Sequence, residues 1–251
     1  MYNKPLVSII TVCYNSGKTI EDTIKSVMNQ TYENIEYIVI DGLSEDNTLD
    51  IVNKYSKLSN REFRIISEKD RGLYDAMNKG IKMAKGDIVA IINSDDFYID
   101  NNVINDIVNE FNKEKVDVVY GDLVFVDEKD TDKVVRTWIA KSGEFKKGWN
   151  PPHPTTFIKK EVYEKYGYFN INLRIAADYD ILYRFLEKYK CSASYINRKL
   201  VKMRIGGEST GSIKNIIKGN KEVINSLKNN GAKGSFLIAI TRLVKKINQF
   251  N

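Results

Sequence analysis

The stretch "VSIITVC", residues 7–13, decides the fold that the sequence predicts. It is a continuous run of mostly apolar, β-branched residues, which is typical of a strand buried on both faces of a parallel sheet. Residues 18–30 then repeat their apolar side chains at helical spacing, and a second strand-like run follows at 35–41. Because parallel strands are joined by a crossover helix, these three segments predict a β-α-β unit.

The alternation of strands and helices continues along the first half of the chain. Further strands are expected at 63–67, 87–93 and 116–126, and further helices at 46–56, 73–86 and 102–113. A chain of 251 residues, 42% of them hydrophobic, can bury one large core. We therefore expect an α/β fold with a doubly wound, mostly parallel sheet flanked by helices. The second half is less regular, and its proline-rich stretch at 149–157 predicts a loop.

The positive charge is concentrated in the last part of the chain. The net charge is +6, but residues 211–251 carry eight Lys or Arg against one Glu, which leaves −1 for residues 1–210. We expect two helices in this basic extension, and residues 236–250 combine an apolar stripe with cations. This pattern predicts contact with an anionic membrane, with packing on the domain or in a homodimer as the alternatives. A nucleic-acid-binding protein is disfavoured because the body is not broadly basic.

Cysteine usage and the N-terminus both favour a cytoplasmic protein. Cys13 and Cys191 are two isolated cysteines, so they form neither a disulfide framework nor a metal-binding motif. The first ten residues lack a signal-peptide pattern. No run approaches the roughly 20 apolar residues that a membrane-spanning helix needs.

Polar and acidic residues follow each of the first four predicted strands. They are Tyr14, Asn15 and Ser16 after the first strand, Asp41 and Ser44 at the second, Asp70 and Arg71 after the third, and Ser94, Asp95 and Asp96 after the fourth. Ligands of open parallel sheets bind beyond these carboxyl ends. Neither GxGxxG nor GxxxxGK[ST] is present, so a glycine cradle for phosphates is disfavoured. An acidic edge would accept a diphosphate through Mg²⁺ or Mn²⁺, which prefer carboxylate and phosphate oxygens.

Asp95 and Asp96 are adjacent, which suggests two different tasks. If the chain is still extended there, their side chains point to opposite sides. One would then face a nucleotide and the other a cation. Asp178 and Asp180 raise a similar question, because two residues apart on a helix they point about 200° apart. One of them is then available as a catalytic base, and the other as a first-turn acid favourable to the helix dipole.

The motifs "VSIITVCYN", "VIDGLSEDNT", "YDAMNKGI" with "AKGD", "NSDD", "PHPTTF" and "AADYDILYRF" occur in the order found in family 2 glycosyltransferases of the GT-A fold. The resemblance covers about residues 5–210 and is greatest to bacterial members that build surface polysaccharide such as O-antigen or capsule. It implies a nucleotide-sugar donor, usually UDP-linked, a divalent metal (Mn²⁺ or Mg²⁺), and inverting hexosyl or N-acetylhexosaminyl transfer. It also implies a saccharide acceptor, carried on polyprenyl diphosphate at the cytoplasmic face of the inner membrane.

The resemblance also implies a role for individual residues. The glycosyltransferase domain would comprise residues 1–210, with a nucleotide-binding half at 1–125 and an acceptor and catalytic-base half at 126–210, followed by the extension at 211–251. Asp96 would bind the metal and Asp178 would be the catalytic base. The nucleotide sugar would be bound by Thr11, Tyr14, Asn15, Asp41, Asp70, Arg71, Lys79 and Asp95. Lys79 enters as a phosphate partner because many relatives have Arg where this chain has Met77; its alternative is a surface pair with Asp75.

Four further residues are candidates for an acceptor or diphosphate loop, namely Trp149, His153, Arg204 and Ser209. His153 has a surface or core histidine as its alternative, and Trp149 could stack on a sugar or belong to the core. Relatives often have a histidine within residues 203–209, where this chain has none. A nucleotidyltransferase remains the rival enzyme class, although "CYNSGKT" is a poor match to a phosphate loop.

Overall fold

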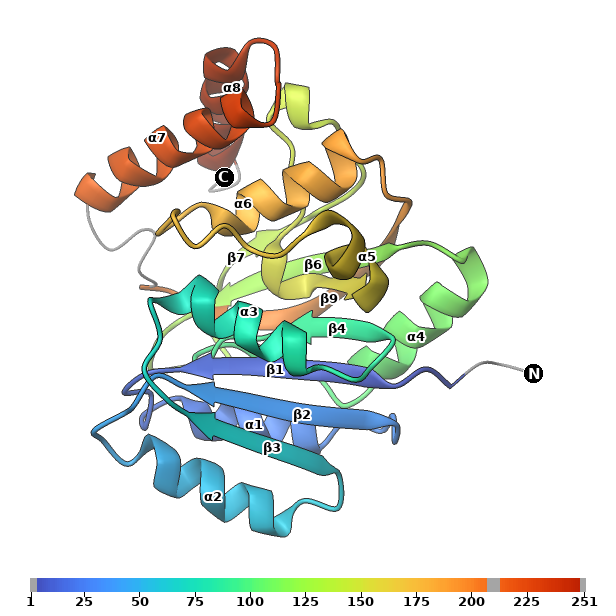
Figure 1. The fold of residues 1–251 in the computed structure, drawn as a ribbon, viewed down its shortest axis with the longest axis vertical. Helices are drawn as coiled ribbons and strands as arrows, with labels where there is room; N and C mark the ends of the chain where they lie inside the picture. The colour runs from blue at the N-terminus through green and yellow to red at the C-terminus, as the bar shows by residue number, and fades with distance from the viewer. Residues whose placement is uncertain (1–3, 207–212, 249–251) are drawn as a thin grey trace.

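The computed structural model describes residues 4–206 and 213–248. They form a curled sheet with helices on both faces (Figure 1). The strands are β1 (Val7–Cys13), β2 (Ile35–Asp41), β3 (Glu62–Ser67), β4 (Ile88–Ile91), β5 (Phe97–Tyr98), β6 (Val118–Val126), β7 (Val134–Trp138), β8 (Thr156–Lys159) and β9 (Ala193–Arg204). The helices are α1 (Ile20–Met28), α2 (Thr48–Leu58), α3 (Leu73–Met83), α4 (Val103–Glu114), α5 (Lys160–Tyr166), α6 (Ala177–Leu182), α7 (Ile213–Asn229) and α8 (Ser235–Asn248).

The sheet combines a parallel half with a mixed half. Its strand order is β3-β2-β1-β4-β8-β6-β9-β5, with β7 beside β6. The pairs β1–β2, β2–β3 and β1–β4 are parallel, which confirms the predicted α/β fold. β8 runs antiparallel to both β4 and β6, and was not predicted. The sequence predicted only a loop in this region, because three prolines precede the short strand β8.

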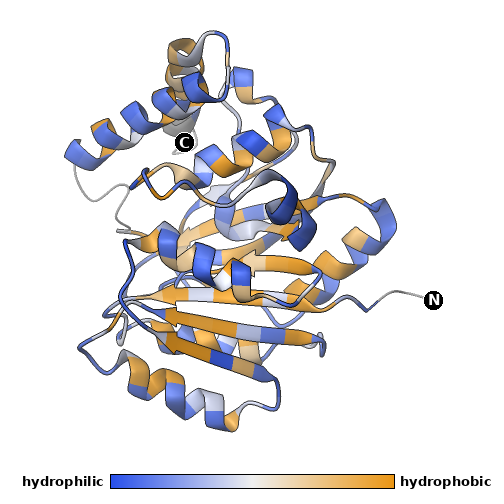
Figure 2. Ribbon diagram, in the orientation of Figure 1, coloured by the Kyte–Doolittle hydropathy of each residue, from blue (hydrophilic) through white to orange (hydrophobic). Residues whose placement is uncertain are grey.

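Both faces of β1, β2 and β4 are buried, as the continuous apolar run of β1 predicted, whereas the edge strand β3 is partly exposed. Alternate residues of β1 face opposite sides, so Ile9 packs with α1 and α4, whereas Ile10 packs with α3. Both side chains are fully buried. In Figure 2 the strands are accordingly hydrophobic along most of their length. This core holds the carboxyl ends of the strands at one edge.

The two C-terminal helices pack on the domain with one face only. Val223 and Leu227 of α7, with Ile238 and Ala239 of α8, join the same core as α6. On the opposite face of α8, Phe236 and Leu237 are exposed, at 66% and 64%. Among the described helices, none combines the length and apolar character that crossing a bilayer requires.

Candidate active site

The loops after β1, β2 and β4 are joined by hydrogen bonds at the carboxyl edge. Asn15 has a left-handed backbone (φ 49°), and its N–H donates to the hydroxyl of Ser44 at 2.8 Å. Its side-chain oxygen accepts from the N–H of Glu45, also at 2.8 Å. Ser16 and Ser94 share a hydrogen bond of 2.8 Å between their hydroxyls. The structure thus brings together three of the strand ends that the sequence singled out, with the Tyr14 side chain exposed beside them.

Asp41 and Thr11 are both fully buried. The Asp41 carboxylate accepts from the Ser67 hydroxyl at 2.7 Å and from the Ser44 N–H at 3.1 Å. It thereby connects the end of β3 to the loop that follows β2. The Thr11 hydroxyl accepts from the Tyr37 phenol at 2.9 Å on the side of the sheet that faces α1. The Thr11 side chain is therefore enclosed in the core, and its place in the nucleotide pocket stays a prediction.

The loop between β3 and α3 carries two predicted nucleotide contacts, Asp70 and Arg71, and α3 carries a third, Lys79. The Asp70 carboxylate accepts from the N–H of Gly72 at 2.7 Å and shapes the loop. The Arg71 side chain is 73% exposed and forms an ion pair with Asp75 at 3.3 Å. Lys79 instead pairs with Glu68 at 2.8 Å. The Lys79 ammonium is thus directed at Glu68, while its charge still helps to lower the pKa of Asp75.

Asp95 and Asp96 lie in a turn, not in an extended strand. β4 ends at Ile91, and the N–H of Asp96 donates to the carbonyl of Asn93 at 3.1 Å. The premise that strand geometry separates the two side chains is therefore wrong, but their surroundings still differ. Asp95 is partly buried, whereas Asp96 is fully buried. Burial, and next the charge of Asp95, raise the pKa of Asp96 well above its ordinary value.

Two oxygens in this turn lack a protein partner although they are buried. One Asp96 oxygen accepts from the Asn93 amide at 3.0 Å, while Asp96 Oδ1 and Asn93 Oδ1 have none. Among residues 4–206 and 213–248 no group of three His, Cys, Asp or Glu side chains is placed to hold a metal ion. Mg²⁺, however, commonly binds one or two carboxylates and completes its shell with water and substrate phosphates. The two unpaired oxygens fit such an ion, and the sequence argument had omitted Asn93.

Arg204 holds this turn in place. It is buried, and it donates to the Asp95 carbonyl at 2.6 Å. It also forms an ion pair with Asp22 of α1, and its guanidinium lies 4.9 Å from the centre of the Phe97 ring. These contacts give Arg204 a structural task next to Asp95 rather than a place on an open loop. Ser209 lies outside the described residues.

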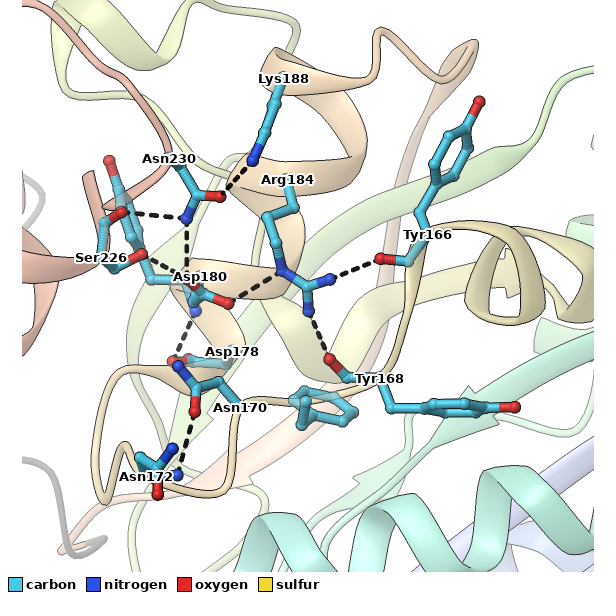
Figure 3. Close-up of polar contacts among 12 residues, drawn as sticks. Tyr166, Tyr168, Asn170, Asn172, Asp178, Asp180, Arg184, Lys188, Ser226 and Asn230 are labelled. Atoms are coloured by element: carbon cyan, nitrogen blue, oxygen red, sulfur yellow. Dashed lines mark hydrogen bonds and ion pairs between the residues drawn. The ribbon is translucent and has the colours of Figure 1, made fainter. Parts of the chain in front are cut away.

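Asp178 and Asp180 have different environments at the start of α6 (Figure 3). Asp180 is 4% exposed and pairs with Arg184 at 3.0 Å. It also accepts from Ser226 of α7 at 2.6 Å and from Asn230, which directly follows α7, at 3.0 Å. Asp178 is partly exposed, and one oxygen accepts the Tyr179 N–H at 2.7 Å. Asp180 is thus a buried structural acid, which leaves Asp178 as the acid accessible to a substrate.

His153 lies close to Asp178, whereas Trp149 is partly buried and packs against the core. Burial lowers the pKa of His153, and the Asp178 charge opposes that shift. The histidine ring packs edge-on against Phe169 with centroids 5.4 Å apart. The Trp149 indole donates to the Ala140 carbonyl at 2.8 Å and packs edge-on against Phe145. Trp149 is thus a partly buried side chain packed against the core that also lines a pocket, and both interpretations of it stay open.

Comparison with known proteins identifies related sequences. A family model described as "Glycosyl transferase family 2" matches residues 8–177. A glycosyltransferase of Haemophilus influenzae is 32% identical over 232 residues, which cover 86% of this chain and 70% of that protein. WfaP of Escherichia coli, named as a UDP-Glc:α-D-GlcNAc-diphosphoundecaprenol β-1,3-glucosyltransferase, is 41% identical over 105 residues, covering 41% of this chain and 40% of its own. GlyG of Streptococcus pneumoniae is 34% identical over 125 residues, or 50% of this chain and 41% of GlyG.

Several of these matches are partial, and the structural likeness extends further. The chain spans about two fifths of the length of the first curated relatives. The mannosyltransferase PcManGT from Pyrobaculum calidifontis, solved with GDP-Man and Mn²⁺, has a TM-score of 0.71 at 20% identity, covering 96% of this chain and 70% of that one. TarS of S. aureus has a TM-score of 0.69 at 19% identity, covering 95% and 43%. At these identities the likeness establishes the fold alone.

Proposed function

Because the chain belongs to glycosyltransferase family 2, we propose that it is a metal-dependent, inverting enzyme that transfers a sugar from a UDP-sugar to a saccharide acceptor. The acceptor is a saccharide on polyprenyl diphosphate, and the pathway is assembly of a bacterial surface polysaccharide. The relative WfaP, named for a diphosphoundecaprenol-linked acceptor, supports this choice of acceptor. The TarS complexes with UDP and UDP-GlcNAc support a UDP-linked donor.

The observation that carries this proposal is the pair of unpaired buried oxygens on Asn93 and Asp96. Leaving a buried acceptor without a partner costs about 1–3 kcal/mol, so such a pair at a strand end indicates a ligand. The Asp96 and Asn93 side chains would hold a divalent cation there. When bound, the cation would neutralise the diphosphate of the donor and stabilise it as a leaving group.

Side chains of residues 1–125 would bind the nucleotide, and side chains of residues 126–210 would act on the acceptor. Tyr14, Asn15, Asp70 and Arg71 would bind the nucleotide at the edge, and Asp95 would contact the ribose. Asp41, buried beneath them, would reach the base through the hydroxyls of Ser44 and Ser67. Asp178 would accept the proton of the acceptor hydroxyl as that oxygen attacks the anomeric carbon. Inversion needs one base and no covalent intermediate, so a single accessible acid on α6 suffices. His153, favoured as the neutral imidazole, would line the acceptor side.

A donor screen tests the activity and its dependence on metal. Sugar nucleotides would be incubated with the protein and Mn²⁺ or Mg²⁺, and the released nucleotide measured. We expect slow hydrolysis of one UDP-sugar, since water can replace the missing acceptor. EDTA should abolish the release and added Mn²⁺ should restore it. Undiminished hydrolysis in EDTA would contradict the metal-dependent mechanism.

The exposed face of α8 supports contact with the cytoplasmic leaflet, where a lipid-linked acceptor would lie. Exchanging both Phe236 and Leu237 for Ser should weaken binding to anionic vesicles at least about tenfold, because each large apolar side chain contributes about 1.5–3 kcal/mol when fully buried. Cosedimentation with phosphatidylglycerol vesicles measures this. Leu58→Ser is the matched control, since Leu58 on α2 is 63% exposed. Unchanged sedimentation, or a homodimer that the double variant dissociates, would contradict the membrane assignment.

A further inference from the structure

The segment that precedes Asp178 is held by a carboxylate from another helix. Glu222 of α7 accepts three backbone N–H groups in succession, those of Arg174, Ile175 and Ala176. Its Oε2 lies 3.1, 2.8 and 3.0 Å from these nitrogens. Hydrogen bonds to an ionised carboxylate are roughly twice as strong as those between neutral groups. Three of them on consecutive residues restrict the backbone immediately before Asp178.

The close approach of α7 to this segment has a second cause. Gly219 lies one turn before Glu222, and a Cβ added there would come within 3.0 Å of the Ile175 side chain. α6 itself lacks a capping side chain, because its N-cap residue is Ala176. One turn further along α7, Ser226 binds Asp180, as described above. α7 therefore holds the segment on both sides of Asp178, whereas the family match ends at residue 177.

The same segment is joined to the donor side of the site. The Arg174 guanidinium donates to the carbonyl of Arg71 at 2.9 Å. Gly72, next along the chain, has φ of 119°, and a Cβ there would lie 2.8 Å from the Arg174 side chain. The loop that carries Asp70 and Arg71 is thus in direct contact with the segment that Glu222 fixes. Hydrogen bonds therefore connect α7 to residues 174–176, and residues 174–176 to the loop that carries Asp70 and Arg71.

We propose that Glu222 is a positioning residue, which sets the place of Asp178 relative to the donor loop. This inference rests on the proposed role of Asp178 as the base. Catalysis is sensitive to such placement, since a shift of about 1 Å can lower a rate by about 10²-fold. The basic C-terminal extension then contributes to catalysis through Glu222 of α7, in addition to the membrane contact proposed for α8.

The test compares Glu222→Ala and Glu222→Gln with the parent protein. The probe is hydrolysis of the sugar nucleotide that the donor screen selects, with Mn²⁺ present. For Glu222→Ala we expect kcat to fall by about 10–100-fold, with the Kd of UDP changed less than about twofold. Glu222→Gln should recover part of the loss, because its amide oxygen can still accept N–H groups. Glu164→Ala on α5 is the control, since it also removes one negative charge, but from an exposed side chain.

Amide hydrogen exchange gives a second, activity-independent measure. Removing the carboxylate should speed exchange at the amides of residues 174–176, with little change at α3. Unchanged exchange there, or a kcat within about twofold of the parent, would overturn the role of Glu222. Adding Glu222→Ala to Asp178→Asn should cause little further loss, because both act on one step. If Asp178→Asn alone kept full turnover, the proposed base would fail instead, while faster exchange in Glu222→Ala would still show its hold on the segment.

Discussion

Asp178→Asn is expected to keep donor binding and to lower turnover by about 10²–10⁴-fold, the usual contribution of a general base. Asparagine has nearly the same shape, and its oxygen can still accept the Tyr179 N–H that Asp178 accepts. It cannot take up the proton of the attacking hydroxyl. The loss should therefore appear in kcat and hardly at all in the Kd of UDP. Calorimetric titration with UDP and Mn²⁺, together with hydrolysis rates for the selected donor, measures the two quantities separately.

Asp180→Asn provides the matched control, because it makes the same chemical change two residues away. Asp180 is buried and paired with Arg184, so removing its charge leaves a buried guanidinium with a weaker partner. Breaking a buried pair is strongly destabilising. We expect a clearly lower Tm for Asp180→Asn and a nearly unchanged Tm for Asp178→Asn. If Asp178→Asn kept more than about a tenth of the turnover, Asp178 would not be the base.

The parallel half of the fold was predictable from local sequence, whereas the mixed half was predictable only in part: a strand was expected at 116–126, where β6 lies, but β8 and β5 were not expected. β1 and β2 are buried on both faces, so their mostly apolar, β-branched runs are easily found. β8 is four residues long and β5 only two, and neither carries enough residues for a periodic pattern. The packing of α7 and α8 was one of several open alternatives, because an amphipathic pattern does not say what covers the apolar face.

The site residues divide in the same way. Asp96 could be singled out as a candidate site residue, because it is an acid at the end of a buried strand. The burial of Thr11 was not predicted, because nearness to a strand end does not determine which face of the sheet a side chain occupies. Arg204 pairs with Asp22, which lies 182 positions away in the sequence, and no local sequence pattern predicts such a contact. Glu222 was counted only as one acid in a basic tail, since its partners are backbone N–H groups that carry no sequence signal.

Asp96→Asn is expected to abolish metal-dependent turnover and, at neutral pH, to raise the stability of the metal-free protein. Asparagine keeps the size of the side chain but removes the charge that a divalent cation requires. Burial raises the pKa of Asp96, so the folded protein binds a proton more tightly there than the unfolded chain does. The stability that this group contributes is therefore fully present at pH values below the ordinary aspartate pKa. It is lost as the pH rises toward the raised value.

Thermal unfolding with and without Mn²⁺ separates the two effects. The metal-free parent should lose stability as the pH rises above about 4, the ordinary aspartate pKa, and Asp96→Asn should reduce that loss. A gain of about 1 kcal/mol would raise Tm by about 2–4 °C in a protein of this size. Mn²⁺ should stabilise the parent but not the variant, because a ligand stabilises only the form that binds it.

Asp100→Asn is the control, because Asp100 is an exposed acid four residues away, and this change should alter neither the metal response nor turnover. A variant that kept its Mn²⁺ stabilisation and full activity would show that the cation binds elsewhere. A metal-free variant less stable than the parent at neutral pH would show that the buried charge is satisfied by protein groups alone.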